Sequence, residues 1–302
     1  MEPWNRTKDF ELFISKWNLN RDVLFSMHRL SQCFGVFRGH MTAATSKIRR
    51  MSGLLSEGLR VRQISNLSLA TCKSSDDSAE VLNRPTLAEF DQIPILDGKR
   101  IVGILERNGK KQRPLDDSLL VSADEHLALF IFTLKSQPYR LVVDGTAIKG
   151  IVTWSDLLKA PVLLFAYALI AELELLMNGA IQIKYGGDDR WILELDKDEQ
   201  NAINKRKRKL EKENLILPTI ELADFAHKAK VIHTPFLDRF HFDTDLAKLI
   251  RLRNSVAHVH EVVRSDADLH RFVEELETAT AWTNTLFEPT SHLDGESFKK
   301  KG

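Results

Sequence analysis

The residues Ile93-Pro94-Ile95-Leu96-Asp97-Gly98 form a short apolar run that ends in a turn signal, and Ile101-Val102-Gly103-Ile104-Leu105 follows at once. Two apolar runs on either side of an Asp-Gly pair predict a strand, a turn and a strand. The same pattern returns 47 positions later, as Leu141-Val142-Val143-Asp144-Gly145 and then Ile148-Lys149-Gly150-Ile151-Val152. Repeated units usually stack, because one unit alone cannot bury its apolar face. The sequence therefore predicts two copies of one structural unit packed together.

Helical signals accompany the second predicted hairpin. A helical stretch over residues 122–135 precedes it, and a further helix is expected to start over residues 155–158. Each repeat is therefore expected to run strand, helix, strand, strand, helix.

Helical patterns also flank the two repeats. Thr7 and Asn20 can cap two N-terminal helices, and the C-terminal half carries helical patterns over residues 161–177, 198–214, 243–263 and 266–286. We expect an α+β chain of four parts: an N-terminal helical segment (1–58), the repeat pair (59–160), an all-α domain (161–288) and a flexible tail (289–302).

Composition narrows the class of protein. The chain has 302 residues, with 43 Lys and Arg against 42 Asp and Glu, so a protein that coats nucleic acid over its whole surface is not expected. The two cysteines, Cys33 and Cys72, cannot build a disulfide framework, which indicates a reducing, cytoplasmic compartment. The longest apolar run, residues 160–171, is followed by Glu172 and Glu174. We expect a buried helix there rather than a membrane span.

The run Gly150-Ile151-Val152-Thr153-Trp154-Ser155-Asp156-Leu157 closes the second repeat. With the repeats over residues 59–160, it resembles a tandem pair of CBS domains, a Bateman module. The resemblance implies an adenosyl nucleotide (AMP, ADP, ATP or a related compound) as regulatory ligand, with no cofactor required. Asp156 would accept the ribose hydroxyls and Thr153 would approach a phosphate, with Tyr139 and Arg140 beside the cleft. The first repeat has Glu106 and Gly109 at the matching positions, so one nucleotide per pair is expected.

Two other interpretations of this run stay open. Thr153 and Asp156 can form a helix N-cap with an acidic residue in the first turn. A degenerate pair of repeats can also serve only as a scaffold for dimerisation. Arg140, on a predicted strand, can simply be solvated.

Arg253-Asn254-Ser255-Val256-Ala257-His258 stands in the helical pattern of residues 243–263. This run resembles the motif of the HEPN superfamily, in which Arg and a polar residue precede His. The resemblance implies metal-independent RNA cleavage at a homodimer interface. His258 would act as general acid and base, Arg253 would hold the scissile phosphate, and Asn254 would orient either His258 or the phosphate. The other interpretation is a structural polar network between helices.

The densest basic run is Lys205-Arg206-Lys207-Arg208-Lys209. It could attract an RNA backbone, or it could be a solvated helix whose charge is balanced by neighbouring acids. Histidines near the HEPN-like motif show no metal-ligand spacing, so no metal site is predicted.

The sequence thus predicts a nucleotide-sensing, metal-independent endoribonuclease that acts as a cytoplasmic homodimer in stress response or phage defence. The alternative is a non-catalytic regulator in which the helical domain dimerises or binds a partner.

Overall fold

The computed structural model describes residues 51–135, 137–236, 240–257 and 266–291. The N-terminal helices expected around Thr7 and Asn20, the tail and His258 lie outside these residues. The chain divides into two compact units, Leu55–Leu164 on the one hand and Met1–Leu54 with Phe165–Gly302 on the other. We call them the repeat unit and the helical unit.

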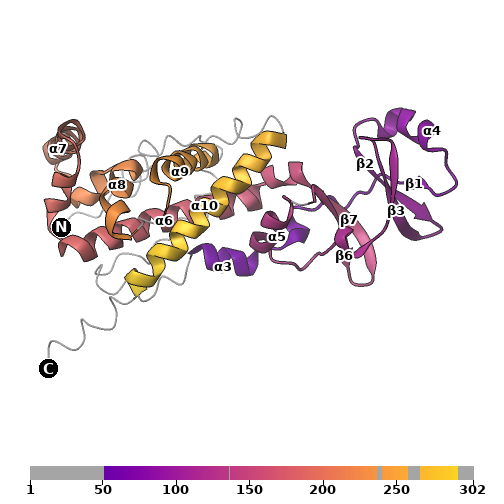
Figure 1. Ribbon diagram of the computed structural model, residues 1–302, viewed down its shortest axis with the longest axis horizontal. Coiled ribbons are helices and arrows are strands. Elements are labelled where there is room, and N and C mark those ends of the chain that lie inside the picture. The colour runs from indigo at the N-terminus through magenta and orange to yellow at the C-terminus, as the bar shows by residue number, and fades with distance from the viewer. Residues whose placement is uncertain (1–50, 136, 237–239, 258–265, 292–302) are drawn as a thin grey trace, which may run out of the picture. The chain divides into compact units, whose positions relative to one another are not determined.

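Two sheets build the repeat unit (Figure 1). The first has the order β1-β2-β3-β4, and β1 is parallel to β2 while the other neighbours are antiparallel. The second has the order β5-β6-β7, with the same parallel and antiparallel pairings. The strand bounds are β1 Cys72–Lys73, β2 Gln92–Asp97, β3 Arg100–Glu106, β4 Lys111–Pro114, β5 Leu120–Ser122, β6 Tyr139–Asp144 and β7 Ala147–Thr153.

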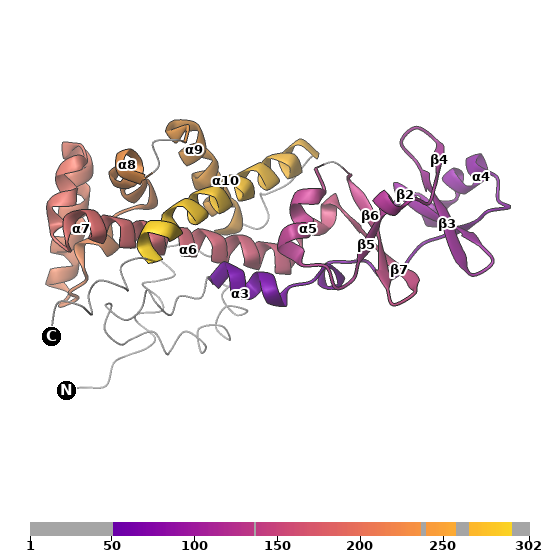
Figure 2. The same cartoon turned by 60° about the horizontal axis from the view of Figure 1, so that its bottom comes forward.

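Short helices lie between these strands and at both ends of the strand region. Helix α3 Met51–Gly58 and the 3-10 turn Val61–Gln63 precede β1, and the 3-10 turn Trp154–Leu158 follows β7. Between the strands lie α4 Ser78–Asn83, α5 Leu127–Thr133 and the 3-10 turns Pro85–Leu87 and Asp117–Leu119. Figure 2 shows α4 beside the first sheet and α5 close to the second. The helical stretch predicted over residues 122–135 is shorter than expected. Ser122 ends β5, residues 123–125 form a turn and His126 bridges to Arg60, so α5 begins only at Leu127.

The predicted repeat is confirmed in detail. Gly98 and Gly145 end the matching strands at φ values of 59° and 65°, in the left-handed region that glycine adopts without strain. The β2–β3 ladder has a bulge at Ile95/Leu96, and the β6–β7 ladder has one at Val142/Val143, 47 residues later. A shared core joins the two repeats: Ile104, Leu119, Tyr139 and Leu141 are buried together.

The segment that precedes each repeat pairs with the last hairpin strand of the other repeat. Asn66, which precedes the first repeat, pairs with Ile151 of β7 in the second. Arg113 on β4, 47 residues after Asn66, pairs with Ile104 of β3 in the first repeat. An added Cβ at Gly150 would lie 2.8 Å from the Asn66 carbonyl oxygen, and one at Gly103 would lie 2.6 Å from the Arg113 carbonyl oxygen. Glycine recurs at these two positions because a crossing backbone leaves no room for a side chain.

The first repeat departs from the predicted order at its end. No helix directly follows β3; the described chain turns back at Gly109 and Lys110, whose φ values are 95° and 49°, and forms β4. In the second repeat, Thr153 and Asp156 start a helical turn instead. The physical reason is Gly109 itself, which favours a tight turn and offers no carboxylate to cap a helix.

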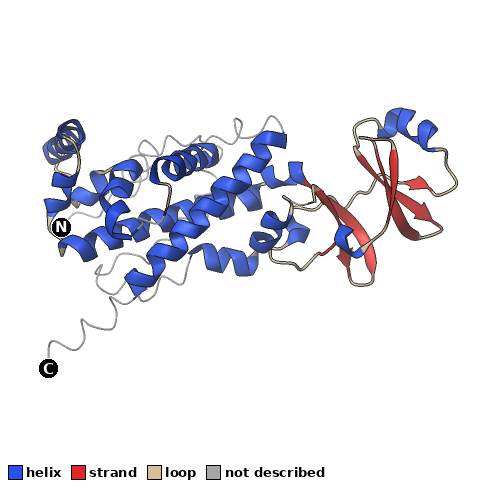
Figure 3. Cartoon of the chain, in the orientation of Figure 1, coloured by secondary structure: helices blue, strands red, loops and turns tan. Residues whose placement is uncertain are grey.

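The helical unit contains α6 Ala160–Tyr185, α7 Lys197–Lys212, α8 Phe225–Phe236, α9 Phe242–Ala257 and α10 Asp266–Ser291, with 3-10 turns at Asp189–Glu194 and Thr219–Leu222. The part of this unit that the structure describes has no strand (Figure 3). Gly186 and Gly187, at φ 62° and 81°, end α6. The helix α8 was not predicted. Helices α9 and α10 lie side by side (Figures 1 and 2).

Among the described residues, α6 is the one helix long and apolar enough to cross a membrane by length and composition. This is weak support for a span, because 61% of its most apolar window is buried inside the protein. The helix also carries the buried Glu172 and Glu174, and Glu174 is paired with Lys228 of α8. These are features of a core helix, as the sequence predicted.

Replacing Gly150 with Ala should lower the free energy of unfolding by about 1–3 kcal/mol, because the new methyl group overlaps the Asn66 carbonyl. Urea unfolding measures this. Gly58→Ala is the matched control, since nothing lies within 4 Å of an added Cβ there. Equal stability of Gly150→Ala and the parent would contradict the close crossing.

Candidate functional site

The helical turn after β7 is built around the Asp156 carboxylate. Thr153 is extended, with φ −129° and ψ 174°, and its backbone N–H donates to Asp156 Oδ2 at 2.6 Å. The Thr153 hydroxyl donates to the same oxygen at 3.1 Å and lies 2.8 Å from the Ser155 hydroxyl. Thr153 and Asp156 therefore form the helix-capping contact that was one of the interpretations of this run. Asp156 is only 8% exposed, so its charge needs partners.

The other oxygen of Asp156 pairs with Lys159. The distance from Lys159 Nζ to Asp156 Oδ1 is 2.8 Å, and the same ammonium donates to the Ile64 carbonyl at 2.5 Å. The sequence does not indicate Lys159 as a site residue, because its partner Ile64 lies 95 positions away in the chain. No local pattern indicates such a contact.

Tyr139 lies opposite Thr153 in the β6–β7 ladder. Its buried hydroxyl donates to Glu106 Oε1 at 2.5 Å. Burial and the neighbouring Glu106 carboxylate raise the pKa of Tyr139 to about 12, against the opposing effect of Arg113. The predicted cleft residue is thus a neutral bridge between repeats.

The side chain of Arg140, the next residue, hydrogen-bonds to nearby backbone carbonyls. Its guanidinium donates to the Gln137 and Tyr139 carbonyls at 3.0 and 3.1 Å. Burial, and the nearby charge of Arg113, lower the pKa of Arg140. The structure gives Arg140 a role in holding the loop before β6, and its phosphate contact stays a prediction.

The HEPN-like motif is described only in part. Arg253 is half-buried on α9 with its Nε atom buried, whereas Asn254 is exposed. The fully buried stripe of the helix is Leu249, Leu252 and Val256, with Arg253 at its border. His258 lies outside the described residues, so the arrangement of the three side chains stays a prediction.

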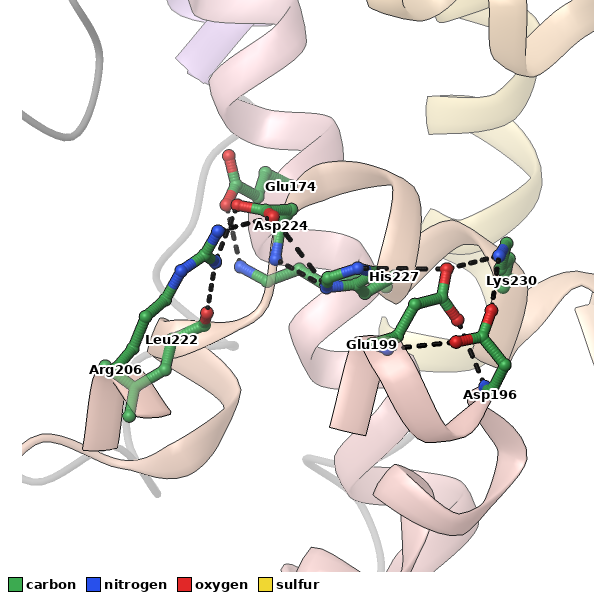
Figure 4. Close-up of polar contacts among 9 residues, drawn as sticks. Glu174, Asp196, Glu199, Arg206, Leu222, Asp224, His227 and Lys230 are labelled. Carbon is green, nitrogen blue, oxygen red and sulfur yellow. Dashed lines mark hydrogen bonds and ion pairs between the residues drawn. The ribbon is translucent and has the colours of Figure 1, made fainter. Parts of the chain in front are cut away.

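Asp224, just before α8, is bound by Arg206 of the basic helix α7 (Figure 4). Both terminal nitrogens of Arg206 donate to Asp224 at 2.8 Å, and Arg206 also reaches the Leu222 carbonyl at 2.9 Å. Burial acts to raise the pKa of Asp224, but the bonds and charge of Arg206 and the charges of His227 and Arg253 bring it below its usual range. Asp224 therefore stays ionised between these cations.

Part of the basic run is thus structural. Arg206 is bound to Asp224, and Lys207 lies 3.7 Å from Asp189 and donates to the Thr219 hydroxyl at 3.3 Å. Lys205, Arg208 and Lys209 are exposed. Arg206 is exposed as well, so four of the five cations are presented to solvent on α7.

Figure 4 also shows Glu199 between His227 and Lys230. Nearby, the fully buried Lys228 pairs with Glu174 at 2.7 Å. Such a pair is costly to break, because the remaining charge would be buried alone. Among the described residues, no group of three or more His, Cys, Asp or Glu could hold a metal ion.

Comparisons with known proteins give a limited result. No protein-family model and no curated protein matches the sequence. Similar solved structures include the CBS domain of a bacterial CNNM/CorC family Mg²⁺ transporter in complex with ATP, at 16% identity and a TM-score of 0.31, covering 37% of this chain and 94% of that one. Another is a CBS domain pair in complex with 5′-methylthioadenosine and S-adenosyl-L-methionine, at 19% identity and a TM-score of 0.29, covering 33% and 96%. We draw no function from likenesses this low.

Helix α9 is fixed to α10 by a buried acid, which gives a pH-dependent test. Arg251 Nε lies 2.8 Å from Glu275 Oε1, and burial raises the pKa of Glu275 despite that cation. A raised folded-state pKa means that the contribution of Glu275 to stability is fully present below its ordinary value of 4.5 and is lost as pH rises through the folded value. The gain in unfolding free energy of Glu275→Gln over the parent should therefore grow as the pH rises from 4.5 through the raised folded-state pKa.

Urea unfolding across that pH range measures the difference. The exposed neighbour Glu274, changed to Gln, should give a flat profile. A difference that shrinks with rising pH for Glu275→Gln would contradict the assignment.

Proposed function

We propose that the repeat unit binds one adenine nucleotide, and that the bound nucleotide controls an RNA-cleaving helical unit. The observation that carries the first part is the buried carboxylate of Asp156, held by Thr153 at the end of the second repeat. A buried carboxylate with acceptor capacity left on one oxygen suits the hydroxyl donors of a ribose.

The asymmetry of the repeats supports a single site. The first repeat places Glu106 where Thr153 stands, and that carboxylate already accepts from Tyr139. Gly109 stands where Asp156 does and forms a turn. Only the second repeat therefore offers a ribose acceptor of this kind.

The catalytic part rests on the motif of α9. In this proposal Arg253 holds the scissile phosphate, Asn254 orients the reacting groups, and His258 transfers the proton, with two chains meeting as a homodimer. The position of Arg253 at the border of the buried stripe and the exposure of Asn254 are compatible with contact to a substrate. No metal or cofactor is needed for this chemistry, and a stress or phage-defence role would follow from RNA cleavage under nucleotide control.

A non-catalytic regulator is the second candidate, and one observation favours it. The charge of Arg253 acts on Asp224, which Arg206 already binds through two nitrogens. An arginine balanced in this way can serve the packing of α8 against α9 rather than a phosphate.

The first test is nucleotide binding by Asp156→Asn. Asparagine retains an acceptor for the Thr153 N–H but loses the charge, so affinity for AMP or ATP should fall by roughly 10- to 100-fold, as for hydrogen bonds to charged groups. Calorimetry measures the affinity. Asp97→Asn, at an exposed turn of the first repeat, is the control that should bind like the parent. Unchanged binding by Asp156→Asn would refute the ribose assignment.

The second test is RNA cleavage with and without adenine nucleotide. Loss of a general acid or base should slow His258→Ala by about 100-fold or more. His241→Ala removes an exposed histidine and should cut at the parent's rate. Equal rates for His258→Ala and the parent would refute the catalytic role of His258, whereas a parent that does not cut RNA would favour the non-catalytic regulator.

A further inference from the structure

We infer that Lys159 competes with the nucleotide for Asp156, and that ligand binding therefore releases Lys159 from the segment that precedes the first repeat. This inference rests on the proposed adenine-nucleotide site. It adds a regulatory contact that ties the site to residues 59–67, which we call the leading segment.

The argument starts from the acceptor capacity of one carboxylate. An ionised carboxylate has about four lone-pair positions, two on each oxygen. Thr153 fills those of Oδ2 through its backbone N–H and its hydroxyl, at 2.6 and 3.1 Å. Lys159 takes one position on Oδ1, at 2.8 Å. One position is left, whereas the two hydroxyls of a ribose bring two donors, so both can bind only if Lys159 leaves.

Lys159 is able to leave. Its side chain is 41% exposed, so the ammonium can be solvated once it is displaced. Asp156, by contrast, has a side chain only 10% exposed and cannot follow it into water. In the empty protein Lys159 thus compensates a buried charge, and in the bound protein the ribose hydroxyls replace it.

Displacement of Lys159 has a consequence outside the site. The same ammonium donates to the carbonyl of Ile64, a fully buried residue of the leading segment. Backbone hydrogen bonds tie this segment to the second repeat. The Val61 N–H donates to the Glu125 carbonyl at 3.0 Å, the Leu127 N–H donates to the Leu59 carbonyl at 3.0 Å, and Asn66 pairs with Ile151. Loss of the Lys159 contact removes one of the bonds that hold it.

The first repeat, all of which the structure describes, has no lysine at the position that matches Lys159. The residue 47 positions before Lys159 is Gln112, whose side-chain amide donates to the Ser78 hydroxyl at 2.8 Å. The switch is thus confined to the repeat with Asp156. Ligand binding is therefore expected to act on the leading segment and not on β4, its counterpart.

Calorimetry with two nucleosides tests the competition, since neither carries a phosphate that Lys159 could bind. Lys159→Met removes the partly exposed ion pair that adenosine must otherwise break. The variant should therefore bind adenosine about two- to five-fold more tightly than the parent does. Lys159→Met and the parent should bind 2′,3′-dideoxyadenosine, which lacks both hydroxyls, with equal affinity. Lys159→Arg keeps the charge and should bind adenosine like the parent. Unchanged or weaker adenosine binding by Lys159→Met would overturn the inference.

Hydrogen exchange on the parent protein keeps the test open if Lys159→Met does not fold. Adenosine should speed exchange of the Val61 and Asn66 amides while it slows exchange in β6 and β7, and dideoxyadenosine should not produce the difference. Uniform slowing of all these amides would overturn the release of the segment. Failure of the nucleotide site itself is distinguishable, because Asp156→Asn would then bind adenosine as tightly as the parent.

Discussion

The close crossing of two backbones at Gly150 is the constraint on which the repeat unit depends. Because residue 150 has no side chain, Asn66 can pair with Ile151 and hold the leading segment against the second repeat. That position brings the Ile64 carbonyl to Lys159, and Lys159 to Asp156. The matching crossing at Gly103 holds β4 on the first repeat. One local requirement for glycine thus organises both the sheets and the surroundings of the proposed nucleotide site.

The helical unit is organised by paired charges. Asp224 pairs with Arg206 and lies 3.9 Å from His227 Nδ1, and the buried Lys228 is matched by Glu174 of α6. On α7, Arg206 and Lys207 of the basic run are engaged with Asp224 and Asp189, while Lys205, Arg208 and Lys209 are exposed.

Local patterns in the sequence predicted the hairpins, their repeat and most of the C-terminal helices, because turn residues and apolar spacing act over a few positions. They did not predict α8, because Pro235 suggested a break in regular structure, whereas it stands in the last turn of the helix. They also predicted a closing helix in the first repeat, where Gly109 forms a turn. At the site, Thr153 and Asp156 could be found from their spacing. The contacts of Lys159 and Glu106 could not be predicted, since their partners Ile64 and Tyr139 are distant in the chain and only the fold brings them together.

The central claim is that the Asp156 turn of the second repeat, and not its counterpart in the first, receives the ribose of an adenine nucleotide. A titration of the intact chain with AMP, followed by backbone amide NMR shifts, tests it most directly. The account predicts that the largest shifts fall on the Thr153 amide, whose N–H is bonded to Asp156, and on residues 154–159, while residues 106–109 stay unchanged. Shifts centred on residues 106–109, or none over residues 153–159, would contradict it.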